Sequence, residues 1–213
     1  MKTSIWSVWM LVPAVVFTAA APAFSGDGAE DIFDLIQSRR SVRDYLPTPV
    51  PKDRILKILD AARMAPTSGN QQPWKFLVVQ DRAKLDRLVE EMVGFRVQAG
   101  ANDKKLSAGE MTILREKSRA SALRYLTAPV FIVVLTDSQS MYPTYNHWDG
   151  PLAAGYLMLA ARGLGYGTVF ITDGLDFSVI RKVLAIPDRY EIVCATPLCV
   201  PVQWPESPPK KPL

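Results

Sequence analysis

The sequence contains only one histidine and two cysteines in 213 residues, which excludes several classes of active site. A structural zinc site takes four Cys or His ligands, and His147, Cys194 and Cys199 are too few to build one. A nucleophilic triad would need His147, yet no Gly-x-Ser-x-Gly motif occurs. His147 lies in a turn-like segment, YNHWDG, and is predicted to be a surface or structural residue. These residues therefore predict neither a nucleophilic triad nor a metal site.

The sequence also lacks the usual glycine-rich signatures of nucleotide binding. Neither a Walker phosphate loop nor a Gly-x-Gly-x-x-Gly motif after a strand is present. The segment GLGYG, residues 163–167, follows a predicted helix and precedes a predicted strand. This order is typical of a helix C-cap and turn, so the segment is not predicted to bind phosphate.

The cysteines Cys194 and Cys199 lie in YEIVCATPLCVP, which is typical of a buried strand followed by a turn. Five residues of extended chain would keep the two sulfurs too far apart to bond. Two buried thiols are predicted. A disulfide stays open as an alternative if Pro197 folds the chain back, because an exported protein would meet oxidising conditions.

The composition indicates one globular domain. Hydrophobic residues make up 48% and charged residues 22%, and 25 basic against 21 acidic residues give a net charge of +4. The basic residues are spread along the chain, so no nucleic-acid partner is predicted.

The N-terminus has the pattern of a signal peptide. Lys2 precedes a long uncharged stretch that ends in small residues, and Ala21-Pro22-Ala23 fits a small-x-small cleavage site. We predict a signal peptide over residues 1–23, a single domain over 24–213 and an exported, periplasmic protein without stable membrane insertion. An uncleaved anchor is the alternative, although Pro13 and the alanines weaken a spanning helix.

The rest of the chain alternates helices and strands irregularly. Predicted helices cover residues 29–40, 51–65, 82–94, 107–126, 149–163 and 176–184, and predicted strands cover 75–81, 128–137, 168–172 and 190–200. Residues 201–213 contain five prolines and are predicted to form an extended strap. This order predicts a mixed sheet with helices on both faces.

Two polar clusters stand out. Arg39, Arg40 and Arg43 surround Ser41 at the end of the first helix, where either solvent or a bound phosphate would separate the charges. Residues 67–72 place hydroxyls, amides and a glycine between Pro66 and Pro73. This second cluster is either an ordinary polar loop or one that recognises the edge of a flat heterocycle.

The motifs RRSVRDY, APTSGNQQPW, LAARGLGYGTVFIT and VLAIPDRYEIVCATPLCVP together resemble the FMN-dependent nitroreductase family. The resemblance runs from about residue 31 to the end. It implies an α+β fold with a mixed, largely antiparallel four- to five-stranded sheet flanked by helices. It also implies a homodimer with two FMN sites at the interface.

The resemblance implies a role for each cluster. Arg39, Arg40 and Ser41 would hold the FMN phosphate and ribityl chain, and Arg43 would reach the pyrimidine edge of the ring. A loop that commonly comes from the second subunit would line the ring with Pro66, Thr67, Ser68, Gly69, Asn70 and Gln72. Backbone amides near flavin N5 and O4 would come from Ile171, Thr172, Asp173 and Gly174. Lys210 would return to the phosphate.

The implied function is a flavin oxidoreductase. Electrons pass in two steps from a reduced donor, NAD(P)H or another, to a nitroaromatic, quinone or similar acceptor. Two alternatives stay open: a reductive dehalogenase-like or flavin-converting relative, and an exported FMN-binding protein without enzymatic activity. For the first, residues 95–115 would form a lid, although a solvated loop is the preferred interpretation.

The chain departs from the family pattern in two respects. Cys199 and Val200 precede Pro201, where the family often has a glycine, and the C-terminal arm is short. Export is also unusual, because NAD(P)H is scarce outside the cytoplasm, and this leaves the identity of the donor open.

Overall fold

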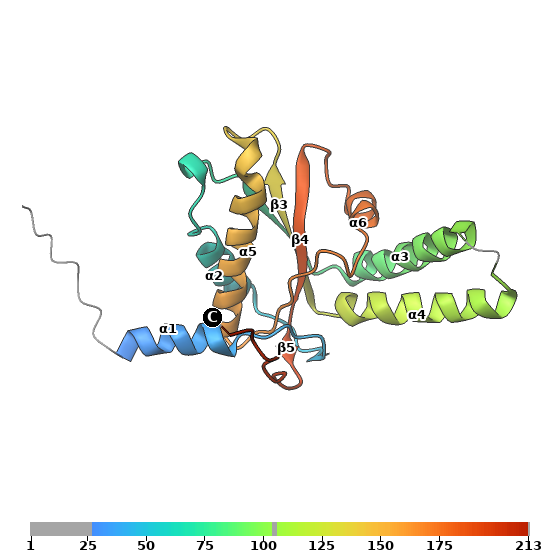
Figure 1. Ribbon diagram of the computed structural model, residues 1–213, viewed down its shortest axis with the longest axis horizontal. Coiled ribbons are helices and arrows are strands. Elements are labelled where there is room, and N and C mark those ends of the chain that lie inside the picture. Colours follow the sequence, from blue (N-terminus) through green and yellow to red (C-terminus); the bar gives the residue numbers. More distant parts are fainter. Residues whose placement is uncertain (1–26, 104–105, 213) are drawn as a thin grey trace, which may run out of the picture.

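A three-stranded antiparallel sheet forms the centre of the computed structural model, which describes residues 27–103 and 106–212 (Figure 1). The strands are β2 (Trp74–Val79), β3 (Val130–Asp137) and β4 (Tyr190–Leu198), in the order β2-β3-β4. The predicted signal peptide lies outside the described residues. Among the residues that are described, no helix is long and apolar enough to cross a membrane.

An irregular extended segment, residues 167–171, widens this sheet beyond β4. Gly167 and Ile171 bridge antiparallel to Cys199 and Ala195, and Thr168 forms a parallel bridge with Ser41. Regular pairing is interrupted where the Val169 N–H donates to the side-chain oxygen of Thr196 at 3.1 Å. The predicted strand at 168–172 is thus a set of single bridges. The α+β class with a mixed, largely antiparallel sheet is confirmed.

Helices cover both faces of the sheet because β3 is apolar on both sides. Phe131, Val133 and Leu135 pack into a cluster with residues of α3, α4 and α6 (Phe177–Leu184). Ile132 and Val134 pack on the opposite face, against α2 (Lys52–Ala62) and α5 (Asn146–Gly163). The uninterrupted apolar run of β3 is typical of a strand buried on both faces.

The helices α3 (Arg82–Asp103) and α4 (Ala108–Leu126) lie side by side as an arm that extends from the body (Figure 1). The prediction of a solvated loop is therefore wrong for residues 95–103 and 108–115, which are helical. A Cβ atom at Gly100 would lie 2.5 Å from Leu114, so the glycine permits a close approach of the two helices. Ser107 and Glu110 form a capping box that begins α4.

The helix α1 (Asp27–Ser38) lies on the other side of the body from this arm (Figure 1). After it, the short strands β1 (Tyr45–Leu46) and β5 (Val200–Pro201) pair antiparallel. Beyond β5 the chain bends at residues 202–203 and has no regular secondary structure up to residue 212, so the extended strap stays a prediction. At the end of α5, Gly165 has a positive φ of 82°, which agrees with the predicted cap and turn.

Candidate functional site

A pocket of about 670 Å³ opens at the end of α1 and gathers four of the predicted residues: Arg39, Arg40, Ser41 and Lys210. Its wall comes from one side of α5, with Phe170 closing it from the irregular edge of the sheet. The volume falls within the range of about 300–1,000 Å³ that is usual for small-molecule pockets. The strap therefore brings Lys210 beside arginines that lie far earlier in the chain.

The side chain of Arg40 has an incompletely paired guanidinium. Its Nη1 donates to the carbonyl oxygens of Gln37 and Arg39, the latter at 2.8 Å. Its Nε is buried and has no hydrogen-bond partner among the described residues. Buried donors are nearly always paired in folded proteins, so a group absent from the structure is expected to accept this one. An anion such as a phosphate fits this donor, and Arg39 and Lys210 supply further positive charge.

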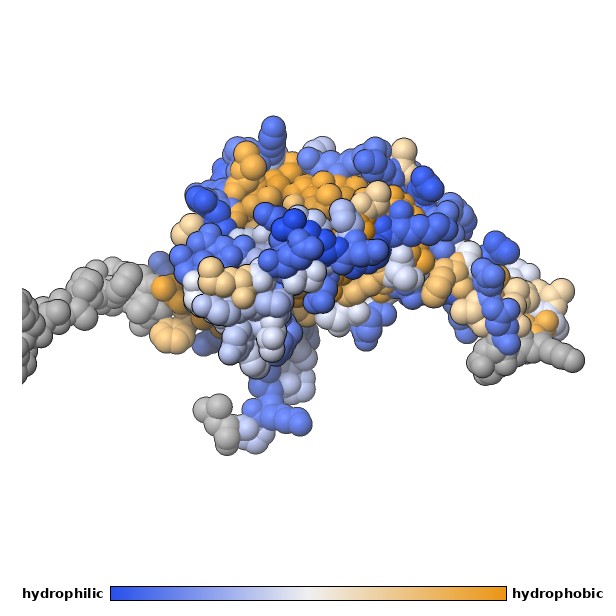
Figure 2. Space-filling model, turned by 90° about the horizontal axis from the view of Figure 1, so that it is seen from above, coloured by the Kyte–Doolittle hydropathy of each residue, from blue (hydrophilic) through white to orange (hydrophobic). Residues whose placement is uncertain are grey.

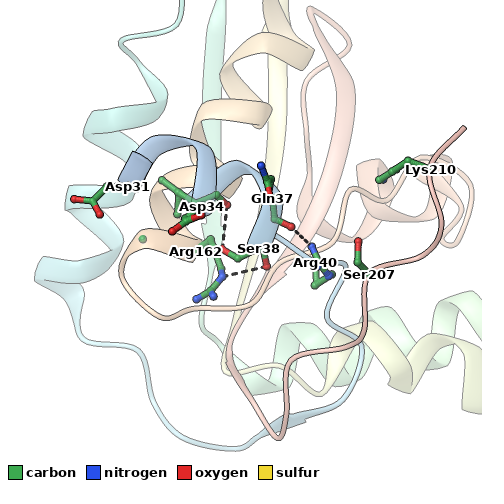
Figure 3. Close-up of a pocket in the computed structure, with 10 residues that line it drawn as sticks. Asp31, Asp34, Gln37, Ser38, Arg40, Arg162, Ser207 and Lys210 are labelled. Atoms are coloured by element: carbon green, nitrogen blue, oxygen red, sulfur yellow. Dashed lines mark hydrogen bonds between the residues drawn. The ribbon is translucent and has the colours of Figure 1, made fainter. Parts of the chain in front are cut away.

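A second pocket adjoins the first and shares Arg40 and Lys210 with it (Figure 3). Arg162 of α5 lies here and donates from Nε to the Ser38 carbonyl at 3.2 Å, which fixes the end of α1 against α5. Asp31 and Asp34 line the same pocket, so it holds both basic and acidic side chains. The positive charge is therefore concentrated at the Arg39 side, in the first pocket.

Arg43 does not line either pocket. Its side chain is exposed, and Nη1 lies 3.4 Å from the Ser41 carbonyl, a long contact. The predicted role of Arg43 at the pyrimidine edge stays a prediction.

The loop of residues 66–72 includes backbone positions in the left-handed region, which residues other than glycine rarely adopt. Gly69, Asn70 and Gln72 have φ values of 58°, 53° and 49° in and after the short 3-10 helix η1 (Ser68–Asn70). Asn and Gly tolerate this region, whereas Gln does so at a cost. These three residues are exposed, and Gln72 donates to the Asn70 side chain at 3.0 Å. The loop therefore presents polar atoms outward.

Two residues that the sequence did not indicate, Asp149 and Gln71, fix the conformation of this loop through hydrogen bonds. Asp149, buried in the first turn of α5, accepts from the Ser68 N–H at 3.1 Å and from the Gln71 side-chain amide at 2.7 Å. Gln71 also accepts from the Tyr142 N–H at 2.7 Å. The partners are 71 to 81 positions apart, so no local sequence signal could have revealed them.

The segment 171–174 begins in the sheet and ends at the surface. Ile171 is buried and pairs with Ala195, and Thr172 and Asp173 are exposed. Arg96 of α3 donates to the Gly174 carbonyl at 2.7 Å, which ties the segment to the arm. The segment follows directly after Phe170 and thus starts at the edge of the first pocket.

The structure does not bring all predicted site residues into one pocket. Residues 66–72 contact α5 at Asp149, whereas the first pocket contacts α5 at Pro151 and Gly155. Successive residues of an α-helix are about 100° apart, so Asp149 and Pro151 point to nearly opposite sides of α5. Within one chain, the arginine cluster and the polar loop lie on different sides of this helix.

The remaining reactive side chains take no part in these pockets. Cys194 and Cys199 are free and buried, which raises the pKa of each thiol to about 12. His147 is exposed beside Trp148, with ring centres 4.0 Å apart. No group of three or more potential metal ligands occurs among the described residues.

Comparison with known proteins gives consistent matches over most of the chain. A model described as Nitroreductase family matches residues 36–198. A 4-nitrobenzoate reductase of Pseudomonas putida is 30% identical over 196 residues, covering 79% of this chain and 85% of its own. An iodotyrosine deiodinase of Thermotoga neapolitana is 28% identical over 192 residues, covering 84% and 91%. The structure of an FMN-dependent nitroreductase from Clostridium difficile R20291 aligns with a TM-score of 0.60 at 25% identity, covering 83% and 91%.

Proposed function

Because the chain belongs to the nitroreductase family, we propose that it is an FMN-dependent oxidoreductase that passes electrons from a reduced donor to a small organic acceptor. The observation that carries this proposal is the first pocket, where Arg39, Arg40, Ser41 and Lys210 meet. The family match and the buried Nε of Arg40, which has no hydrogen-bond partner among the described residues, support the same kind of ligand.

The residues of the pocket fit the phosphate end of FMN. Arg39 and Arg40 would form charge-assisted hydrogen bonds with the phosphate, and Ser41 would add a neutral donor. Lys210 would supply a further charge from the strap. Phe170 and the wall of α5 offer apolar surface beside these donors, as a ligand with a polar tail and a flat ring requires.

The ring-binding loop of each site comes from a second copy of the chain in this proposal. Trp148, Leu152 and Tyr156 are exposed on one face of α5, Tyr145 just before the helix continues this stripe, and Trp148 is 56% exposed. On the helix this stripe lies between the side that faces residues 66–72 and the side that lines the first pocket. A two-fold dimer along the stripe would bring the loop of one chain beside the pocket of the other.

Further apolar surface supports a homodimer. Ile32, Phe33 and Ile36 of α1 are more than half exposed. Figure 2 shows apolar residues gathered in a broad area on the body, bordered by hydrophilic residues. Monomeric soluble proteins rarely expose large contiguous apolar patches, so a patch of this kind indicates an interaction surface.

When bound, FMN would supply the redox chemistry by taking up two electrons from the donor and releasing them to the acceptor. The chain would bind the cofactor, orient its ring and tune its potential. No side chain is assigned as nucleophile or general acid. We propose a nitroaromatic or quinone as the acceptor class, supported by the 4-nitrobenzoate reductase relative.

The identity of the electron donor depends on the compartment in which the protein is located. We propose that residues 1–23 direct export to the periplasm, where a reduced donor other than NAD(P)H would be needed. N-terminal sequencing of the protein from the periplasmic fraction tests this: a mature chain beginning near residue 24 is expected, and an intact Met1 in the cytoplasm contradicts it.

The function is tested by reconstitution with FMN. The purified chain should acquire a flavin spectrum, lose it on anaerobic reduction with dithionite and regain it on addition of 4-nitrobenzoate or a quinone. Binding without acceptor-dependent reoxidation would favour an FMN-binding protein, and the absence of binding would reject the proposal.

Reductive dehalogenation is a second candidate because an iodotyrosine deiodinase is 28% identical over most of the chain. The α3–α4 arm, tied by Arg96 to residues 171–174, is the element that would cover such a substrate. Turnover of 3-iodotyrosine and of a nitrofuran under one reductant separates the two candidates. Faster release of iodide than loss of the nitro group would favour dehalogenation.

A further inference from the structure

We infer that Asp149 is a positioning residue that holds the loop of residues 66–72 in its ring-binding conformation before FMN arrives. The inference rests on the proposed function for the identity of the ligand. The geometry that carries it belongs to this chain alone and involves Asp149, Gln71, Ser68 and Tyr142.

The Asp149 carboxylate uses each oxygen for a different part of the loop. One oxygen accepts from the Ser68 N–H at 3.1 Å, at the start of η1. The other accepts from the Gln71 side-chain amide at 2.7 Å, just after η1. Asp149 is only 2% exposed, and no cation lies within ion-pair distance of it in the part of the chain that the structure describes. The N–H donors of the loop and the N-terminal end of α5 therefore stabilise its charge.

Gln71 carries this constraint further, to the segment before α5. Its side-chain oxygen accepts from the Tyr142 N–H at 2.7 Å, and its amide also donates to the Tyr142 carbonyl at 3.1 Å. The same amide lies 3.4 Å from Asn146, whose own amide donates to the Asp137 carbonyl at 2.8 Å. The loop is thus joined through side chains to the end of β3 and the start of α5.

This hydrogen-bond network surrounds the part of the loop whose backbone has positive φ angles. Gly69, Asn70 and Gln72 all have positive φ; glycine adopts this conformation freely and asparagine tolerates it, but for Gln72 it is costly and persists only when the surroundings fix it. A Cβ atom at Gly69 would lie 2.5 Å from the Tyr142 ring, so the loop also packs closely against that tyrosine. Ser68 and Gln71, the residues tied to Asp149, flank the first two of these positions, and Gln71 directly precedes Gln72.

Asp149 itself would not touch the cofactor in this arrangement. It lies beneath the loop, whereas Gly69, Asn70 and Gln72 face outward. Its effect on FMN is therefore expected to pass through the order of the loop, and this distinguishes it from the arginine cluster.

The test exchanges charge between Asp149 and Gln71. Asp149→Asn keeps the shape but sets two amide donors against each other, and about a tenfold loss of FMN affinity is expected for one broken buried hydrogen bond. Gln71→Glu brings two carboxylates to hydrogen-bond distance and should weaken binding more. In the double variant, the new amide at position 149 would donate to the new carboxylate at position 71, so affinity should recover well above that of Gln71→Glu. Recovery should be partial, because the carboxylate cannot replace the donor to the Tyr142 carbonyl. A double variant no better than the worse single one overturns the inference.

A second readout needs no cofactor. In the protein without FMN, amide hydrogen exchange at Ser68 should be about tenfold faster in Asp149→Asn than in the unaltered chain, since that N–H donates to Asp149. Glu110→Ala is the control, because Glu110 is also a carboxylate that accepts from a backbone N–H, that of Ser107, but it lies at the start of α4, outside this network. It should lower the melting temperature without changing FMN affinity or exchange at Ser68.

The two hypotheses fail differently. If the unaltered protein does not bind FMN, the proposed function is rejected, and hydrogen exchange at Ser68 still decides whether Asp149 orders the loop. If the unaltered protein binds FMN and Asp149→Asn changes neither affinity nor exchange, the role of Asp149 is rejected alone.

Discussion

The guanidinium carbon of Arg162 lies 4.0 Å from the centre of the Trp204 ring, so the C-terminal strap is held against the end of α5. This contact fixes the strap shortly before Lys210, which lines the first pocket. Cation–π contacts of this kind contribute about 0.5–2 kcal/mol. We expect Trp204→Ala to weaken FMN binding several-fold by releasing Lys210, while Trp204→Phe retains most of the affinity.

Titration of FMN into the Trp204 and Lys210 variants checks this dependence. If the strap acts through Lys210, the double variant Trp204→Ala with Lys210→Ala should bind as Lys210→Ala does. Additive losses would mean that Trp204 contributes by another route.

Replacing Arg39 should change mainly the affinity for FMN, whereas replacing Arg43 should change mainly the midpoint potential of bound FMN. Arg39 lines the pocket, and each charge-assisted hydrogen bond to a phosphate contributes about 1.5–3 kcal/mol, so Arg39→Ala should weaken FMN binding roughly ten- to a hundredfold. Arg43 lies outside the pocket, and its predicted place is the pyrimidine edge. Arg43→Ala should then lower the midpoint potential of bound FMN, because a cation there stabilises the reduced ring, with a smaller loss of affinity.

Dissociation constants and midpoint potentials of both variants decide between these roles. An unchanged potential in Arg43→Ala would remove that residue from the ring site. An unchanged affinity in Arg39→Ala would show that the phosphate lies elsewhere.

The sequence predicted the features that depend on local patterns. The α+β class and the family are confirmed, and β3 is buried on both faces as its apolar run indicated. Four predicted site residues do meet in one pocket: Arg39, Arg40 and Ser41, which a motif indicated, and Lys210, which only the family resemblance implied. Whether these residues bind FMN stays a prediction.

The features that the sequence did not reveal depend on contacts between distant segments. The helical arm continues through residues 95–103 because α4 packs closely at Gly100, which local propensity does not show. Asp149 and Gln71 are 78 positions apart, and Arg162 meets Trp204 from a segment on the far side of β4 in the sequence. Such pairs arise only once the sheet has placed α5 between α1 and the polar loop.

The exposed stripe on α5 predicts how the dimer would respond to charge. Trp148→Glu places a carboxylate in the centre of the proposed interface and should convert the protein to a monomer that binds FMN at least tenfold more weakly, because each site needs both chains. Leu56→Glu alters a similarly exposed apolar residue on the outer face of α2 and should leave the dimer intact.

Light scattering after gel filtration, with the flavin content of the eluted peak, checks this. We expect two FMN per dimer in the unaltered protein. A monomer with full affinity for FMN would contradict the composite site.

The two cysteines should be unreactive in the native protein. Burial raises the pKa of Cys194 and Cys199 to about 12, so at pH 8 only about one thiol in ten thousand would be ionised, and access is blocked as well. A colorimetric disulfide reagent should detect no fast-reacting thiol in the native protein and two after unfolding in guanidinium. Detection of none after unfolding would indicate the disulfide alternative.

The pair of Asp137 and Arg189 should make stability depend on pH in the acidic range. Arg189 Nε donates to the Asp137 carboxylate at 2.8 Å and Nη2 forms a second bond, which together hold the pKa of Asp137 below its ordinary value of 3.8. Burial of the carboxyl opposes this shift but is the smaller effect. Because the folded state favours the ionised form, the contribution to stability is complete above the unfolded pKa and is lost as the pH falls through the folded pKa.

The free energy of unfolding should therefore decline more steeply below about pH 4 in the unaltered protein than in Asp137→Asn, which has no proton to gain at this position. Chemical denaturation at a series of pH values between about 2 and 6 measures both slopes. Arg189→Gln should flatten the curve in the same way, since it removes the group that lowers the pKa of Asp137. Equal slopes in all three proteins would show that this ion pair does not contribute to the acid sensitivity of the fold.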